Sequence, residues 1–156
     1  MFIFTLENIG NIKNAVYTTD SIKDKHAERI EYVKTKGLFK DFNMSKYFHK
    51  KPPKNTSMKT LQELYWLRDL PEDKEFVEKH DDVEKVFETV CEEHGIEFPK
   101  KLVKELIKSC SMLELKYHFN RPRPYQLAEY YGIKLGENIL ESMKTPSYPS
   151  GHAAQG

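Results

Sequence analysis

The sequence predicts an all-α protein, and three observations lead to this class. From Thr60 onward, apolar residues recur at intervals of three and four, the period of a helix with one buried face. Alternation at period two, which is typical of a half-buried strand, is missing almost everywhere. Helix-ending residues, among them Pro71 and Gly95, follow the periodic segments. The chain has 156 residues, 38% of them hydrophobic, which is enough to bury the core of one domain.

Two helices are predicted between Thr60 and Gly95. The first ends at Pro71, and its apolar stripe consists of Leu61, Leu64, Tyr65 and Leu67. The second is amphipathic and runs to Gly95, with acidic residues between its apolar positions Phe76, Val83, Phe87 and Val90. We expect this second segment to be a single helix.

Pro99 begins a third predicted helix, because proline is favoured at the first helical position. Its expected buried face consists of Leu102, Leu106, Cys110 and Leu113, widened by Val103 and Ile107. The helix should end near Phe119, since a proline disfavours helical geometry in the residue before it and two prolines follow. Arg121 and Arg123 therefore leave on an extended segment. A fourth, short helix over about residues 125–131 is closed by Gly132.

The distribution of charge predicts two parts of the chain. Residues 1–59 are expected to form a basic, less regular arm or lid, and residues 60–156 a helical domain. Residues 1–60 hold 12 Lys and Arg against 6 Asp and Glu, whereas residues 61–100 hold 5 against 13. The alternative to a binding arm is an ordinary solvated surface. Because the formal net charge is only +1, no global field attracts nucleic acid, and any anion site has to be local.

The composition predicts a soluble, cytoplasmic protein. No uncharged apolar run approaches the roughly 20 residues that cross a bilayer, and the mean hydropathy is −0.71. The apolar opening lacks the basic region and the cleavage site of a secretory signal. Cys91 and Cys110 are expected to be reduced, buried thiols rather than a disulfide.

Two short clusters contain the residues best suited to binding or catalysis. In Pro149-Ser150-Gly151-His152, the glycine allows a backbone to approach a ligand closely, and good helix formers follow, so the cluster is expected at a helix N-terminus that attracts an anion. The hydroxyl of Ser150 adds a donor, and His152 is the side chain best suited to carry a proton near neutral pH. In the other cluster, Lys116 supplies a point charge and Arg123 a planar fork that can bind two phosphate oxygens.

With these spacings the sequence resembles the type 2 phosphatidic acid phosphatase and vanadium haloperoxidase superfamily. The first motif of that family is similar to Lys116 through Arg123-Pro124, and the second to Pro149-Ser150-Gly151-His152. Flanking residues are similar to the soluble bacterial class A acid phosphatases in particular; these are His118, Arg121, Ser147 and Tyr148. The resemblance covers roughly residues 100–156, and residues 1–60 resemble no family.

The resemblance implies an all-helical bundle that hydrolyses phosphoric monoesters with a histidine nucleophile and without a metal or other cofactor. Lys116, Arg123, Ser150 and the amide of Gly151 would bind the phosphate, and His152 would act as the general acid. His118, Arg121 and Tyr148 are expected to lie next to these residues and to support their positions. The implied partner is a phosphorylated small molecule or lipid, with no nucleic acid and no transmembrane segment.

The third motif of the family, which supplies the nucleophile, is absent from the sequence. We expect the chain to be a fragment of a longer enzyme, inactive alone. The alternatives are that a second copy or a second polypeptide supplies the motif, or that the chain is a binding or structural descendant without activity. A haloperoxidase-like enzyme that holds vanadate in the same place is the other enzymatic alternative.

Two weaker signals point to metals, and neither predicts a site. His80-Asp81 is reminiscent of metal-dependent phosphohydrolases but lacks further ligands, so a solvated helix face is expected. Cys91 and His94 have a Cys-x-x-His spacing, yet no second pair completes four zinc ligands.

Overall fold

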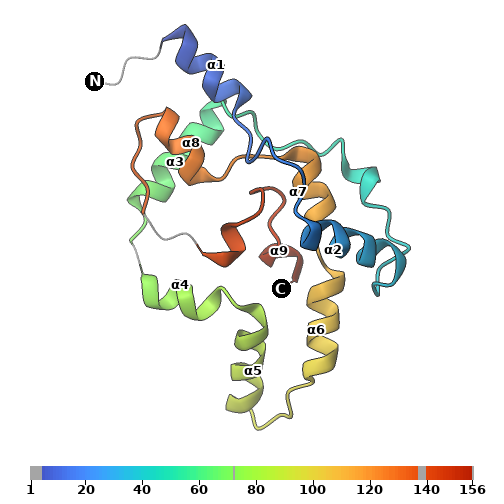
Figure 1. Ribbon diagram of the computed structural model, residues 1–156. Helices are drawn as coiled ribbons and strands as arrows, with labels where there is room; N and C mark the ends of the chain where they lie inside the picture. The colour runs from blue at the N-terminus through green and yellow to red at the C-terminus, as the bar shows by residue number, and fades with distance from the viewer. Residues whose placement is uncertain (1–4, 72, 137–139, 156) are drawn as a thin grey trace. The chain divides into compact units, whose positions relative to one another are not determined.

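The computed structural model describes residues 5–71, 73–136 and 140–155, and within these ranges helices are the only regular elements (Figure 1). The all-α prediction is therefore confirmed at the level of fold class. The α-helices are α1 (Leu6–Asn14), α2 (Asp24–Thr35), α3 (Met58–Asp69), α4 (Lys74–His80), α5 (Val83–Glu93), α6 (Lys100–Ser109), α7 (Leu113–Phe119), α8 (Pro124–Tyr130) and α9 (His152–Gln155). Two short 3-10 helices are η1 (Met44–Tyr47) and η2 (Glu141–Met143). No helix in the described ranges has the length and apolar character needed to span a membrane.

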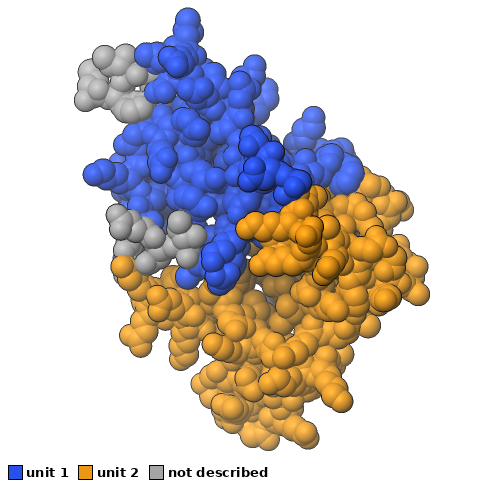
Figure 2. All heavy atoms as spheres, in the orientation of Figure 1, with its two compact units in different colours: residues 1–21, 48–72, 116–148 blue, residues 22–47, 73–115, 149–156 orange. Residues whose placement is uncertain are grey.

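The chain divides into two compact units, each assembled from three segments (Figure 2). Unit 1 consists of Met1–Ser21, Phe48–Glu72 and Lys116–Tyr148, and unit 2 consists of Ile22–Tyr47, Asp73–Leu115 and Pro149–Gly156. Residues 1–59 contribute to both units and carry α1 and α2, which the apolar periodicity after Thr60 does not reveal.

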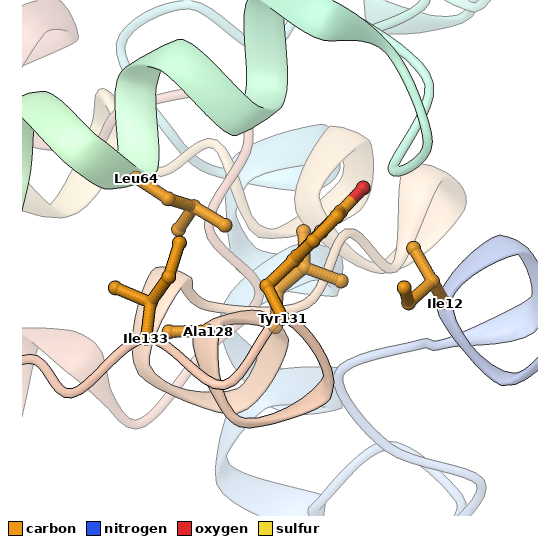
Figure 3. Close-up of a cluster of buried hydrophobic side chains, with 6 residues drawn as sticks. Ile12, Leu64, Ala128, Tyr131 and Ile133 are labelled. Atoms are coloured by element: carbon orange, nitrogen blue, oxygen red, sulfur yellow. The ribbon is translucent and has the colours of Figure 1, made fainter. Parts of the chain in front are cut away.

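The core of unit 1 is an apolar cluster in which α1 packs against α8. Its buried members are Ile12, Leu64, Leu127, Ala128, Tyr131 and Ile133. Figure 3 shows that the labelled side chains of this cluster converge from α1, from α3 and from the end of α8 with the residues after it. The phenol of Tyr131 also donates a hydrogen bond to the carbonyl of Asn55 over 2.7 Å, so the loop before α3 is tied to the core.

Local signals explain where the helices of unit 1 begin and end. The Ser57 hydroxyl caps α3 by accepting from the amide of Thr60. As predicted, α7 ends at Phe119, and Arg123 is extended, with φ −71° and ψ 153°. The predicted fourth helix is α8, which starts at Pro124, and Gly132 beyond it has a φ of 64° that favours glycine.

In unit 2, α5 packs against both α4 and α6, and α6 packs against α2. The single helix expected through Gly95 is wrong, because α4 ends at His80 and α5 begins at Val83. The side chain of Asp82 accepts from the amide of Lys85 and so starts a new helix. An aspartate directly before an apolar run was the available signal.

The third predicted helix is also divided, with α6 ending at Ser109 and α7 beginning at Leu113. The predicted buried face is wrong for Leu102 and Leu106, which are 55% and 37% exposed, whereas Ser109 is 1% exposed. Polar contacts orient this helix: Glu105 on α6 accepts hydrogen bonds from the hydroxyls of Tyr32 on α2 and of Ser109. Ser109 in turn accepts from the backbone amide of Leu38 over 2.9 Å. Cys91 and Cys110 are free thiols and only half-buried, so the expected burial is wrong.

Candidate functional site

Unit 1 brings the segment after α7 beside the segment after η2. The backbone amide of Ser147 donates to the carbonyl of Arg121 over 3.0 Å, and the Ser147 hydroxyl donates to the carbonyl of Pro122 over 2.8 Å. Pro122 is buried, and Pro146 is fully buried. The prolines impose an extended geometry on the residues before them, so these backbone groups are not used within a helix. They are available for hydrogen bonds between the two segments. The first sequence motif and the residues just before the second are thus joined.

Lys116 is a buried cation on α7. It is 7% exposed, and its ammonium donates to the carbonyl oxygen of Pro146 over 2.8 Å. Among the described residues, no carboxylate lies within ion-pair distance of it. Burial, and next the positive charge of Arg123, lower the pKa of Lys116 to about 8, because both disfavour the charged form.

Arg123, at the start of α8, donates hydrogen bonds to residues 142–145, just before the Pro146 that Lys116 contacts. Its Nε donates to the carbonyl of Thr145 over 2.6 Å, and its Nη2 donates to the carbonyl of Ser142 over 2.7 Å and to the Thr145 hydroxyl over 3.2 Å. The backbone amide of Arg123 donates to the side chain of Gln126, which stabilises the first turn of α8. The guanidinium therefore has a defined position, as an oxyanion-binding group requires.

We call Lys116 and Arg123 together the paired-cation site. Lys116 is buried and Arg123 half-buried, and two like charges close enough to influence each other disfavour each other, a cost that an oxyanion between them would relieve. The donors now serve neutral carbonyl oxygens. A phosphate oxygen makes a stronger, charge-assisted hydrogen bond with the same donors. An ammonium and a guanidinium are the groups with which proteins commonly bind oxyanions.

The three residues predicted to surround this pair have other partners. His118 is exposed and stacks on Phe48, with ring centroids 3.7 Å apart. Arg121 lies 3.5 Å from the carboxylate of Glu63. The Tyr148 hydroxyl donates to the carbonyl of Lys50 over 2.9 Å. In the structure these side chains hold neighbouring segments of unit 1.

Ser150, Gly151 and His152 lie in unit 2, where they lead into α9. The prediction that they lie at a helix N-terminus is confirmed, since α9 begins at His152 and the Ser150 hydroxyl oxygen accepts from the amide of Ala153 over 3.2 Å. Accepting this bond leaves the hydroxyl its own hydrogen to donate. The paired-cation site lies in unit 1 and these residues lie in unit 2, so their meeting stays a prediction.

Asp81 is a functional candidate that the sequence analysis missed. Nε2 of His152 lies 3.0 Å from the Asp81 backbone carbonyl oxygen and 3.7 Å from its carboxylate. A carboxylate and a carbonyl oxygen beside an imidazole orient its ring, which suits a general acid. The adjacent pair His80-Asp81 was the only signal in the sequence, and it predicted a solvated helix face. Asp81 instead contacts a histidine 71 positions away.

Asn120 links the site to the N-terminal segment of unit 1 in an unusual backbone conformation. Its φ is 45°, in the left-handed region, and its side-chain amide donates to the carbonyl of Thr18 over 2.7 Å. The buried Oδ1 finds no hydrogen-bond donor in the described part of the chain.

We expect Asn120→Ala to lower the free energy of unfolding by about 1–3 kcal/mol, because alanine loses the bond to Thr18 and is strained at positive φ. Asn120→Gly should cost less, since glycine adopts this φ freely. Urea denaturation followed by circular dichroism measures both variants. An alanine variant more stable than the glycine variant would show that the backbone conformation is not as described.

The fold and the site define an all-helical protein in which a buried lysine and a half-buried arginine donate to backbone carbonyls of one segment. Comparisons with family models, with curated proteins and with solved structures find no match to this chain.

Proposed function

We propose that the chain supplies the phosphate-binding part of a metal-independent phosphatase that acts on phosphoric monoesters. Lys116 and Arg123 bind phosphate oxygens in this proposal, the Ser150 hydroxyl and the Gly151 amide add two donors, and His152 protonates the leaving oxygen. The nucleophilic histidine comes from residues outside this sequence. The helical arrangement is proposed to be of the acid phosphatase and haloperoxidase type, as the two motifs imply.

The observation that supports this proposal is the paired-cation site. A buried lysine with a lowered pKa beside an arginine is a costly arrangement, and strongly perturbed groups gather at functional sites. The chain itself supports assigning Ser150, Gly151 and His152 to the same site. Only Pro149 separates Ser150 from Tyr148, the last residue of unit 1. The contact of Asp81 with His152 supports the role of the histidine as a proton donor.

Titration of the full chain with inorganic phosphate, followed by isothermal calorimetry, tests the proposal. We expect Lys116→Gln to weaken phosphate binding by about tenfold or more, because a hydrogen bond to a charged group contributes roughly 1.5–3 kcal/mol. Lys134→Gln is the matched control, since Lys134 is an exposed lysine of the same unit, and it should keep the affinity. An equal loss in both variants, or no binding by the unaltered chain, contradicts the proposal.

The same contacts favour a second candidate, a structural role without catalysis. Lys116 and Arg123 both donate to backbone carbonyls between Ser142 and Pro146. They could serve only to hold this irregular segment, whose carbonyls need partners once buried. In that case Lys116→Gln changes the stability of unit 1, and the unaltered chain binds no phosphate.

A further inference from the structure

Unit 1 also contains a groove that takes no part in the paired-cation site. Its walls are residues 13–16 at the end of α1, residues 51–56 before α3, and residues 118–122 after α7. Its volume is about 740 Å³, within the range of roughly 300–1,000 Å³ that small-molecule sites occupy. We call it the basic groove, because of the charges that surround it.

Every charged residue that lines the basic groove is positive. These residues are Lys13, Lys51, Lys54 and Arg121. Arg121 is balanced by Glu63, whereas the three lysines form no ion pair with any residue in the described ranges. In a chain with a net charge of only +1, this is a local excess of positive charge. A hollow in unit 2 differs in this respect, since Glu28 and Glu31 line it together with its cations.

Aromatic rings lie beside these charges. His118 and Phe119 line the basic groove, and Phe119 meets the ring of Tyr148 edge-on, with centroids 5.2 Å apart. His118 is exposed although one face of its ring stacks on Phe48, so it offers a flat surface whose orientation is held by packing. Stacking surfaces combined with lysines are what proteins use to bind nucleotides, whose bases stack and whose phosphates need cations.

The end of α1 does not oppose an anion here. The last carbonyls of a helix carry partial negative charge and would repel a phosphate in the groove. The side-chain amide of Asn55 donates to the carbonyls of Ile12 and Ala15, over 3.1 Å and 2.9 Å, and so satisfies these acceptors. Lys13, in the same last turn, is the charged residue among those that line this wall, and its charge is positive.

We propose that the basic groove binds a mononucleotide. The phosphates lie against Lys13, Lys51 and Lys54, and the base stacks on the ring of His118, to which the ring of Phe119 stands nearly perpendicular. The volume of the groove favours a single nucleotide over a polymer. This binding goes beyond the proposed phosphatase role, since it uses neither Lys116 nor Arg123.

Calorimetric titration of the full chain with adenosine triphosphate tests this proposal. Replacing Lys13, Lys51 and Lys54 together by Gln should weaken binding about tenfold, because three favourable charge contacts are lost. The matched control replaces three exposed lysines outside the groove, Lys40, Lys59 and Lys134, and should keep the affinity within about twofold. Circular dichroism of both triple variants verifies that they are folded. Single Lys→Gln variants, each expected to weaken binding by a smaller factor, replace the first triple variant if it unfolds.

Inorganic triphosphate should bind more weakly than adenosine triphosphate, because it has no base to stack. Lys116→Gln should leave the affinity for adenosine triphosphate unchanged, even if it abolishes binding of inorganic phosphate. The proposal is overturned by equal losses in the two triple variants, by equal affinities for the two triphosphates, or by tighter binding of a single strand of about ten nucleotides. Loss of nucleotide binding in a Lys116→Gln variant that circular dichroism shows to be folded would place the nucleotide at the paired-cation site, which overturns this inference and leaves the proposed function standing.

Discussion

Arg123→Ala is expected to lower the free energy of unfolding of unit 1 by about 3–5 kcal/mol, because hydrogen bonds from a charged donor contribute roughly 1.5–3 kcal/mol each. The variant loses the short bonds from Nε to Thr145 and from Nη2 to Ser142. It also removes the Nε donor from the half-buried carbonyl of Thr145, which adds to the cost. Urea denaturation gives the free energy, and hydrogen exchange at the Ser147 amide reports on the segment itself.

Arg123→Lys separates the charge of the side chain from its shape. Lysine keeps the positive charge but cannot reach both carbonyls with a planar fork, so we expect an intermediate loss of stability. The amide of Ser147, which donates to the carbonyl of Arg121, should exchange faster in Arg123→Ala than in Arg123→Lys. A change below about 0.5 kcal/mol in Arg123→Ala, the size of an ordinary surface substitution, would contradict the described contacts.

The stability of the protein is expected to rise between pH 8 and about pH 10 through the titration of Lys116. Its pKa is lowered from 10.5 to about 8 in the folded state, first by burial and then by Arg123. Below pH 8 both folded and unfolded chains carry the proton, so this group adds no pH dependence. Above pH 8 the unfolded chain binds more protons at this position, and stability increases by up to about 1.4 kcal/mol per pH unit.

Lys116→Met provides the reference for this measurement, because it keeps a long side chain but removes the titrating group. The difference in free energy of unfolding between the unaltered chain and Lys116→Met should grow in favour of the unaltered chain from pH 7.5 to 9.5. Burial raises the pKa of Tyr17, Tyr117 and Tyr131, which acts in the opposite direction from about pH 10 upward. These tyrosines are common to both proteins, so they cancel in the difference. A difference independent of pH would show that Lys116 titrates normally.

Anion binding at the paired-cation site should follow the same titration with the opposite sign. The ammonium form of Lys116 binds an oxyanion, and this form is lost as the pH rises through about 8. The affinity of the unaltered chain for phosphate should therefore be lower at pH 9 than at pH 7. In Lys116→Met the affinity should be low at both values.

Much of the fold follows from local sequence signals. The end of α7 at Phe119, the extended Arg123 and the start of α8 at Pro124 were predictable, because proline restricts its own φ and the conformation of the residue before it. Gly132 after α8 was predictable for a similar reason, since glycine adopts positive φ without strain. The break before α5 has a local cause as well, the cap by Asp82, and could have been recognised from an aspartate before an apolar run.

The orientation of α6 was not predictable from its apolar periodicity. Periodicity favours burial of Leu102 and Leu106, yet Glu105 and Ser109 face partners near α2 that lie about 70 positions earlier in the chain. Hydrogen bonds between such distant positions depend on how the helices pack, which local spacing does not specify.

The residues of the candidate site were predictable from the sequence, but their contacts were not. Residue types and their spacing singled out Lys116, Arg123, Ser150 and His152, because cations, a hydroxyl and an imidazole in short motifs indicate anion chemistry. What each side chain contacts became visible only in the folded chain: the carbonyl of Pro146 for Lys116, the carbonyls of Ser142 and Thr145 for Arg123, and Asp81 for His152. These partners lie 19 to 71 positions away. Sequence specifies chemical groups and local backbone geometry, whereas burial and distant hydrogen-bond partners arise from packing.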